Sequence, residues 1–95
     1  MIEIVWSPQA IEDLRSIQLY IGRDSPRYAG LVVRKLVDAV ERLAAFPESG
    51  RVVPEIGDAG MREVLWRNYR IVYRLGGGTV EIVTVFHGAQ LFRVP

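Results

Sequence analysis

A repeated helix start constrains the fold of this chain more than any other feature. Ser7-Pro8 and Ser25-Pro26 each precede apolar residues at helical spacing. A serine side chain accepts a hydrogen bond from a free N–H in the first helical turn, and proline suits the next position because no donor is needed there. The pairs predict two helices, one ending near Gly22 and one running to Phe46 before Pro47. Only two or three residues separate them, so they form an antiparallel hairpin.

Alternating apolar and polar residues predict four short strands, at residues 2–6, 62–66, 69–75 and 80–87. Glycines 76–78 join the last two strands into a β-hairpin, and residues 48–60 form a loop rich in glycine, proline and charge. The element order is β-α-α-β-β-β. It predicts an α+β fold, in which an antiparallel helical hairpin packs on one face of a mainly antiparallel four-stranded sheet.

The two faces of this β-hairpin differ in chemistry. With a regular turn, Leu75 lies opposite Val80 and Arg74 lies opposite Glu81. One face is then apolar, and its residues on the last strand are Val80, Ile82, Thr84 and Phe86. The other face collects Arg70, Arg74 and His87, with Arg62 at its margin, which indicates a contact surface. The assignment requires a hairpin without a bulge, because a one-residue slip turns every later side chain to the opposite face.

Composition narrows the class of protein. We expect a single domain over residues 1–95. The chain has no cysteine and one histidine, so we expect no cofactor and no metal site. No apolar run approaches the about 20 residues that span a bilayer, and we expect a cytoplasmic protein with no membrane partner. The net charge of +1 gives no general nucleic-acid footprint.

Four segments in order resemble the RelE/ParE superfamily of toxins from bacterial type II toxin–antitoxin systems. They are residues 6–14, residues 47–55, the strands at 62–64 and 69–74 (Tyr-Arg-Ile-Val-Tyr-Arg), and residues 87–90. The resemblance implies a growth-arresting toxin that is neutralised by a ParD-like antitoxin, whose C-terminal segment wraps around it. It leaves the target open. RelE-type members cleave mRNA in the ribosomal A site, whereas ParE-type members poison DNA gyrase and are not known to catalyse a reaction.

Metal-free RNA cleavage requires a base, a cation that stabilises the phosphorane, and an acid for the leaving oxygen. By resemblance to RelE-type nucleases, Glu55, Arg70 and His87 are the candidates for this set. Each residue also has a structural interpretation. Arg70 suits an ion pair or an antitoxin contact, Glu55 suits a solvated loop, and His87 suits a hydrogen bond at a strand end.

Departures from the nuclease pattern favour the gyrase-poisoning branch. Gln90 stands where the family often has arginine, and Phe92 stands where RelE-like members place a tyrosine. A ribosomal substrate also favours a strongly basic toxin, which this chain is not. A third hypothesis is an inactive family member that only binds antitoxin.

The expected contacts with a target or antitoxin include two further aromatic residues. The full set is Arg62, Arg70, Arg74, His87, Trp66 and Phe92. The aromatic members, Trp66 and Phe92, suit three roles: stacking on nucleic-acid bases, packing in the core, or lining a groove that antitoxin side chains fill. Leu19 and Leu31 fall outside the main helical stripes and hint at another apolar patch for a partner, although single exposed leucines are ordinary.

Overall fold

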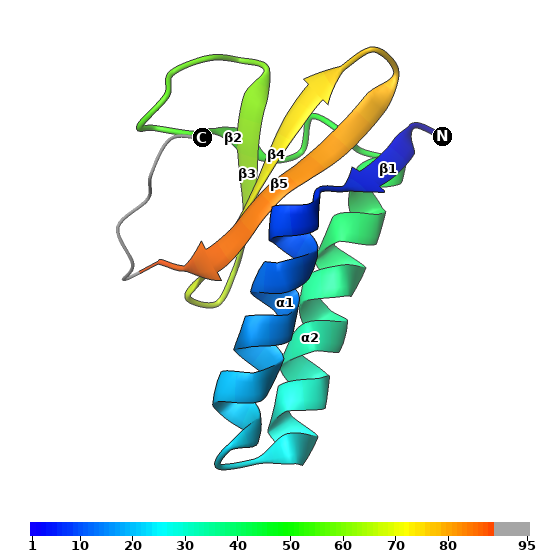
Figure 1. Ribbon diagram of the computed structural model, residues 1–95. Coiled ribbons are helices and arrows are strands. Elements are labelled where there is room, and N and C mark those ends of the chain that lie inside the picture. Colours follow the sequence, from blue (N-terminus) through cyan, green and yellow to red (C-terminus); the bar gives the residue numbers. More distant parts are fainter. Residues whose placement is uncertain (89–95) are drawn as a thin grey trace.

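The predicted helical hairpin forms and covers one face of a sheet, although its second helix ends at Glu41 rather than at Phe46 (Figure 1). The computed structural model describes residues 1–88. Its elements are β1 (Glu3–Trp6), α1 (Pro8–Gly22), α2 (Pro26–Glu41), the 3-10 turn η1 (Arg42–Ala44), β2 (Arg51–Val52), β3 (Met61–Trp66), β4 (Tyr69–Gly76) and β5 (Thr79–His87). Ser7 Oγ accepts a hydrogen bond from the Ala10 N–H at 3.0 Å, and Ser25 Oγ accepts one from the Tyr28 N–H at 3.1 Å. Neither helix is both long and apolar enough to cross a membrane.

The sheet has five strands rather than the predicted four, in the order β1-β5-β4-β3-β2. β1 runs parallel to β5, and the other neighbours are antiparallel. The additional strand, β2, lies within the predicted loop 48–60 and pairs Arg51 with Glu63 and Val52 with Arg62. Two residues are too few to show an alternating pattern, so periodicity does not predict this edge strand. The α+β class is confirmed.

The predicted register of the β-hairpin holds only near its turn. Leu75 pairs with Val80 and Arg74 with Glu81, as expected. Beyond them, Val72 pairs with Thr84 while Tyr73 pairs with Ile82, so Val83 is an extra residue on β5. This β-bulge changes the face of the side chains that follow it. Val85 therefore enters the core beneath the helices, whereas Phe86 packs on the opposite face.

Each face of the sheet has its own apolar cluster. The helix-covered face, packed against α1 and α2, carries the main core, which includes Leu36, Ile71, Tyr73 and Ile82. The other face carries a smaller cluster, in which Val53 and Ile56 from residues 53–60 cover strand residues of the sheet. The strand members of this cluster are Met61, Val72, Val83 and Phe86. We call this second face the loop-covered face, and it is not the open surface that the sequence suggested.

The Tyr73 hydroxyl ties the segment before β2 to the sheet. The residue is fully buried, and its hydroxyl accepts a hydrogen bond from the Gly50 N–H at 3.0 Å and donates one to the Pro47 carbonyl at 2.7 Å. Burial raises the pKa of this hydroxyl, which stays protonated as a donor. Gly50 is required here, because a Cβ at this position would lie 2.6 Å from both the Tyr73 hydroxyl and the Glu63 carbonyl oxygen.

Removing this hydroxyl by Tyr73→Phe should lower the free energy of unfolding by about 1–3 kcal/mol, because the buried Gly50 N–H then lacks its acceptor. Urea denaturation followed by circular dichroism measures the change. Tyr20→Phe is the matched control, since Tyr20 is 72% exposed. Equal stability of the two variants would contradict the role of the Tyr73 hydroxyl.

Candidate functional site

A buried carboxylate organises the charged side chains of the loop-covered face. Glu63 on β3 is 1% exposed, and its two oxygens accept hydrogen bonds from different arginines. Arg51 Nε donates to Oε2 at 2.6 Å, and Arg70 Nε donates to Oε1 at 2.7 Å. Arg51 comes from β2 and Arg70 from β4, so the carboxylate joins three strands of the sheet. The Glu63 carboxylate is thus hydrogen-bonded on both sides, as a buried charge requires.

Glu55 from the covering loop completes this ion cluster. Its two oxygens accept hydrogen bonds from both terminal nitrogens of Arg70 at 2.8 Å, a bidentate geometry. The hydrogen bonds from Arg70 are the main reason that the pKa of Glu55 falls to about 2, and the same bonds raise the pKa of Arg70. The Arg70 guanidinium also lies 5.1 Å from the centre of the Phe86 ring. Arg70 therefore faces two carboxylates and a ring, and its side chain is only 13% exposed.

His87 lies on the other face of the sheet, contrary to the prediction. The bulge at Val83 pairs His87 with Tyr69 rather than placing it beside Arg70 and Arg74. Its ring meets the Tyr69 ring edge to face, with centroids 5.4 Å apart. The predicted set of Glu55, Arg70 and His87 is therefore only partly assembled. Glu55 and Arg70 are bonded together on the loop-covered face, whereas His87 packs on Tyr69 and shares with Arg70 only the lining of an open depression of about 450 Å³.

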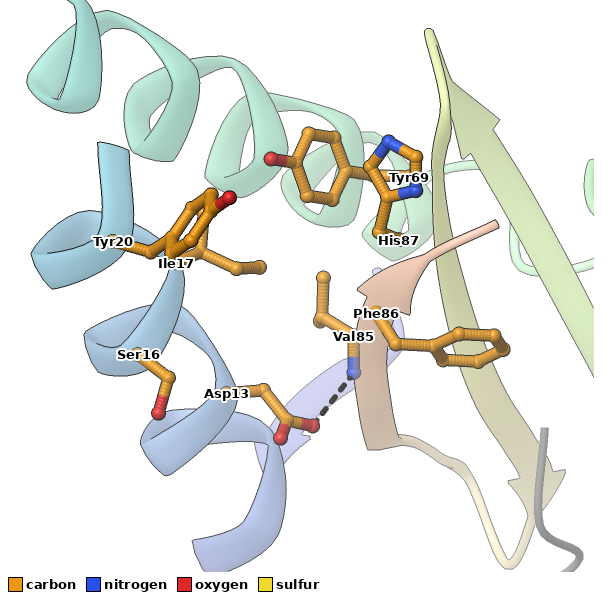
Figure 2. A pocket seen from close by; sticks show the side chains of 8 residues that line it. All are labelled: Asp13, Ser16, Ile17, Tyr20, Tyr69, Val85, Phe86 and His87. Atoms are coloured by element: carbon orange, nitrogen blue, oxygen red, sulfur yellow. Dashed lines mark hydrogen bonds between the residues drawn. The ribbon is translucent and has the colours of Figure 1, made fainter. Parts of the chain in front are cut away.

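A cleft opens where α1 passes the end of β5 (Figure 2). Its volume is about 540 Å³. The residues that line it are Asp13, Ser16, Ile17, Tyr20, Tyr69, Val85, Phe86 and His87. Figure 2 shows Tyr20 and Tyr69 on either side of the space, with His87 next to Tyr69 and the Phe86 ring turned away. Desolvation by burial is the main reason that the pKa of the Tyr69 hydroxyl is raised, and the nearby Tyr28 and Tyr20 hydroxyls raise it further. Tyr69 therefore contributes an uncharged aromatic side chain to the cleft.

Asp13 fixes the wall of this cleft. Its Oδ2 accepts hydrogen bonds from the Val85 N–H at 2.9 Å and from Thr84 Oγ1 at 2.6 Å. β1 pairs with β5 only as far as Ile82, so within residues 1–88 no strand lies beside the following residues of β5 on that edge. The Asp13 carboxylate supplies the acceptor that a neighbouring strand would otherwise provide. Ser7 has a parallel role, since its hydroxyl donates to the Val83 carbonyl at 2.9 Å.

The other predicted contact residues are separated as well. Arg62 is opposite Tyr73 on the helix-covered side, away from Arg70 and Arg74, and it donates to the carbonyls of Ala59 and Gly50 at 3.1 and 3.0 Å. Trp66 packs partly against the main core, and Arg67 lies 5.1 Å above its ring. Arg74 keeps the predicted face and forms an ion pair with Glu81 at 2.7 Å. Phe92 and Gln90 lie outside the described residues.

Glu63, Arg51 and Asp13 are the important residues that the sequence reasoning missed. The contact between Glu63 and Arg70 could have been predicted from the sequence. The turn at residues 67–68 sets Leu65 opposite Arg70, which places Glu63 diagonally next to Arg70 on the same face. Arg51 and Asp13 carry no comparable signal, because Arg51 lies on a strand of two residues without a detectable pattern and Asp13 reaches β5 through the packing of α1.

Comparison with known proteins places this helical hairpin on a sheet among small bacterial toxins. The sequence pattern of the family described as "ParE toxin of type II toxin-antitoxin system, parDE" matches residues 4–92. The chain is 38% identical over 92 residues to Toxin RelE2 of Caulobacter vibrioides, covering 96% of this chain and 100% of that protein. It is 35% identical over 89 residues to Putative toxin Y4kP of Sinorhizobium fredii, covering 92% and 88% of the two chains. The chain belongs to the ParE toxin family of type II toxin–antitoxin systems.

Solved structures share the fold. A chain of the chromosomal ParDE toxin–antitoxin system from P. aeruginosa superimposes with a TM-score of 0.75 at 24% identity, covering 92% of this chain and 96% of that one. A chain of the toxin–antitoxin complex RelBE2 from Mycobacterium tuberculosis gives a TM-score of 0.66 at 22% identity, covering 90% and 96%. At these identities the likeness concerns the architecture alone.

The Glu55–Arg70 contact predicts a defined acid sensitivity. Because the folded pKa of about 2 lies below the ordinary value of 4.5, the contact stabilises the fold above pH 4.5 and is lost as the pH falls from about 4.5 to about 2. The stability difference between wild type and Glu55→Gln should therefore be largest above pH 4.5 and shrink towards pH 2. Urea midpoints measured across this range test it, with Glu3→Gln on the exposed β1 edge as control. A difference that does not change with pH would contradict the ion pair.

Proposed function

We propose that this protein is a growth-arresting toxin that poisons DNA gyrase in the cytoplasm and is neutralised by a cognate ParD-like antitoxin. Membership of the ParE family over residues 4–92 carries the proposal, because poisoning of gyrase is the activity associated with that branch. The solved relatives include toxin–antitoxin assemblies of the ParDE and RelBE2 systems, which supports an antitoxin as a partner of this chain.

The ion cluster supports a role without catalysis. A general base works best when its pKa lies near the working pH, and the Glu55 carboxylate, with a pKa of about 2, is a weak base with both oxygens occupied by Arg70. Arg70 in turn has its charge compensated by two carboxylates, so it offers little to a phosphorane. His87 packs against Tyr69 and lines a depression with Arg70, but Glu55 does not line it. A metal-free nuclease would need all three groups around one phosphate.

A ribosome-dependent mRNA endonuclease is the second candidate, and one observation favours it. The relative from Caulobacter vibrioides that shares 38% identity carries the name RelE2, and RelE is also the name of the branch that cleaves mRNA. The third candidate, an inactive antitoxin-binding protein, is distinguished by a failure to arrest growth.

A paired assay on purified toxin separates the candidates. One arm measures plasmid supercoiling by DNA gyrase, and the other maps mRNA ends by primer extension in a reconstituted translation system. We expect inhibited supercoiling or accumulated cleaved plasmid with intact mRNA. Ribosome-dependent mRNA cuts with unaffected gyrase would overturn the proposal and make Arg70 and His87 catalytic candidates. No effect in either arm would support the inactive member.

We propose that the aromatic cleft beside α1 binds apolar side chains of the antitoxin. It is concave and lined by Ile17, Tyr20 and Tyr69, and such pockets anchor the side chains that dominate binding energy. Tyr20 is 72% exposed, so its ring can be removed with little effect on the fold.

Tyr20→Ala should weaken antitoxin binding at least about tenfold, because a ring at the centre of an interface typically contributes more than about 1 kcal/mol. Isothermal titration of purified toxin with antitoxin gives the dissociation constant. Phe46→Ala is a suitable control, since Phe46 is 65% exposed and does not line the cleft. Equal losses for both variants, or none for Tyr20→Ala, would remove the cleft from the interface.

A further inference from the structure

The aromatic cleft beside α1 holds a carboxylate that the fold leaves without a counter-charge. Among the described residues that line the cleft, Asp13 is the only acid and none is a lysine or an arginine. Its oxygens accept hydrogen bonds from the Gln9 amide at 2.8 Å, the Thr84 hydroxyl at 2.6 Å and the Val85 N–H at 2.9 Å. All three donors are neutral, and within residues 1–88 no ion pair involves Asp13. A carboxylate can accept about four hydrogen bonds, so Asp13 keeps the capacity for one more donor.

Two tyrosine rings border the same space. Tyr20 from α1 and Tyr69 from β4 lie on either side of it. In the view of Figure 2, the apolar side chains of Ile17 and Val85 lie between these rings and Asp13. The face of an aromatic ring carries partial negative charge and attracts a cation within about 6 Å. The cleft therefore combines two rings, an apolar wall and an unpaired carboxylate.

The Tyr20 ring already contacts one guanidinium of the chain itself. The Arg23 guanidinium lies 5.9 Å from the centre of this ring, close enough for a cation–π interaction. Arg23 lines a separate depression with Leu19 and Pro26 and is not among the residues that line the cleft. Arg23 therefore does not neutralise Asp13, and the cleft stays open to a cation from another molecule.

The carboxylate determines which chemistry can close over this cleft. A partner that covered the cleft with apolar side chains alone would remove water from Asp13 and leave its charge buried and unpaired, which is costly. A phosphate or an acidic side chain would add the repulsion of like charges. An arginine or a lysine suits every wall, because its aliphatic stem packs on apolar side chains while its charged head interacts with a carboxylate and with ring faces.

We propose that a basic side chain of the antitoxin, an arginine or a lysine, enters the aromatic cleft and pairs with Asp13. It lies beside the apolar side chains that the cleft also binds, and it makes their burial there favourable because it neutralises the carboxylate. Asp13 also accepts a hydrogen bond from the Val85 N–H of β5, so the pair connects the antitoxin directly to the sheet of the toxin. The inference rests on the proposed function, in which the cleft binds the antitoxin.

A charge series at one position of the cleft tests this pairing. Ser16 is exposed, lines the cleft and makes none of the hydrogen bonds to Asp13. Ser16→Lys places a cation at the cleft, and Ser16→Glu places an anion there. Gln18→Lys and Gln18→Glu are the matched controls, because Gln18 is exposed on the same helix and does not line the cleft, while its variants change the net charge equally. Isothermal titration with the purified cognate antitoxin gives each dissociation constant, and thermal melting checks that each variant is folded.

We expect Ser16→Lys to weaken antitoxin binding at least about tenfold and Ser16→Glu to tighten it at least about threefold, whereas both Gln18 variants stay within about twofold of wild type. Asp13→Asn should also weaken binding at least about tenfold, because asparagine keeps an oxygen acceptor for β5 but loses the charge. Equal weakening by Ser16→Lys and Ser16→Glu would indicate a neutral occupant, and tighter binding by Ser16→Lys would indicate an acidic one. Either result would overturn the inference.

Two other results are distinguishable from these. Self-association of the toxin that Ser16→Lys abolishes would assign the cleft to a second copy and would also overturn the inference. Failure of the wild-type toxin to bind the purified antitoxin would contradict the proposed function, and the cleft is then tested by itself with N-acetyl-arginine methylamide and its neutral citrulline analogue. Larger NMR shifts of the Tyr20 and Tyr69 ring signals with the arginine compound would support the inference, whereas equal shifts or none would overturn it.

Discussion

The buried carboxylate of Glu63 is the interaction on which the charged face of the sheet depends. It is almost without contact to solvent and joins β2, β3 and β4 through Arg51 and Arg70. A buried charge is tolerable only when it is paired and hydrogen-bonded, so the position of each arginine is determined by this acid. Arg70, thus oriented, presents both terminal nitrogens to Glu55 and draws the covering loop onto the sheet. Val53 and Ile56 then have an apolar surface to cover.

The bulge at Val83 has consequences on both sides of the sheet. It turns Val85 into the main core and leaves Phe86 next to Arg70, where its ring faces the guanidinium at 5.1 Å. It also moves His87 to the aromatic cleft with Tyr69 and Tyr20. The chain therefore separates two features spatially: an ion cluster that holds a loop on one face of the sheet, and a concave aromatic cleft beside α1 on the other. This separation favours a protein that acts by binding over one that assembles an acid, a base and a cation around one bond.

Local signals were sufficient for most of the architecture. The two Ser-Pro pairs specified both helix starts, because capping and a fixed backbone angle are properties of adjacent residues. The Arg74–Glu81 pair followed from the turn, where Gly77 and Gly78 adopt positive φ angles that glycine permits. The bulge could not be predicted, since Val83, Val85 and Phe86 are all apolar and each suits either face of a sheet that carries an apolar cluster on both faces. The predicted position of His87 was wrong for this reason: alternation assigned it to a face that one extra residue changed.

The central claim is that Arg70 serves the fold through Glu63, and a double-mutant cycle tests it most directly. Urea denaturation of Glu63→Ala, Arg70→Ala and the double variant gives the coupling free energy of the pair. Each single change should cost about 3–5 kcal/mol, with the double variant less destabilised than the sum by at least about 1.5 kcal/mol. The exposed Arg74–Glu81 pair is the control cycle and should couple by no more than about 1 kcal/mol. Additive effects at Glu63 and Arg70, within about 0.5 kcal/mol, would contradict the account.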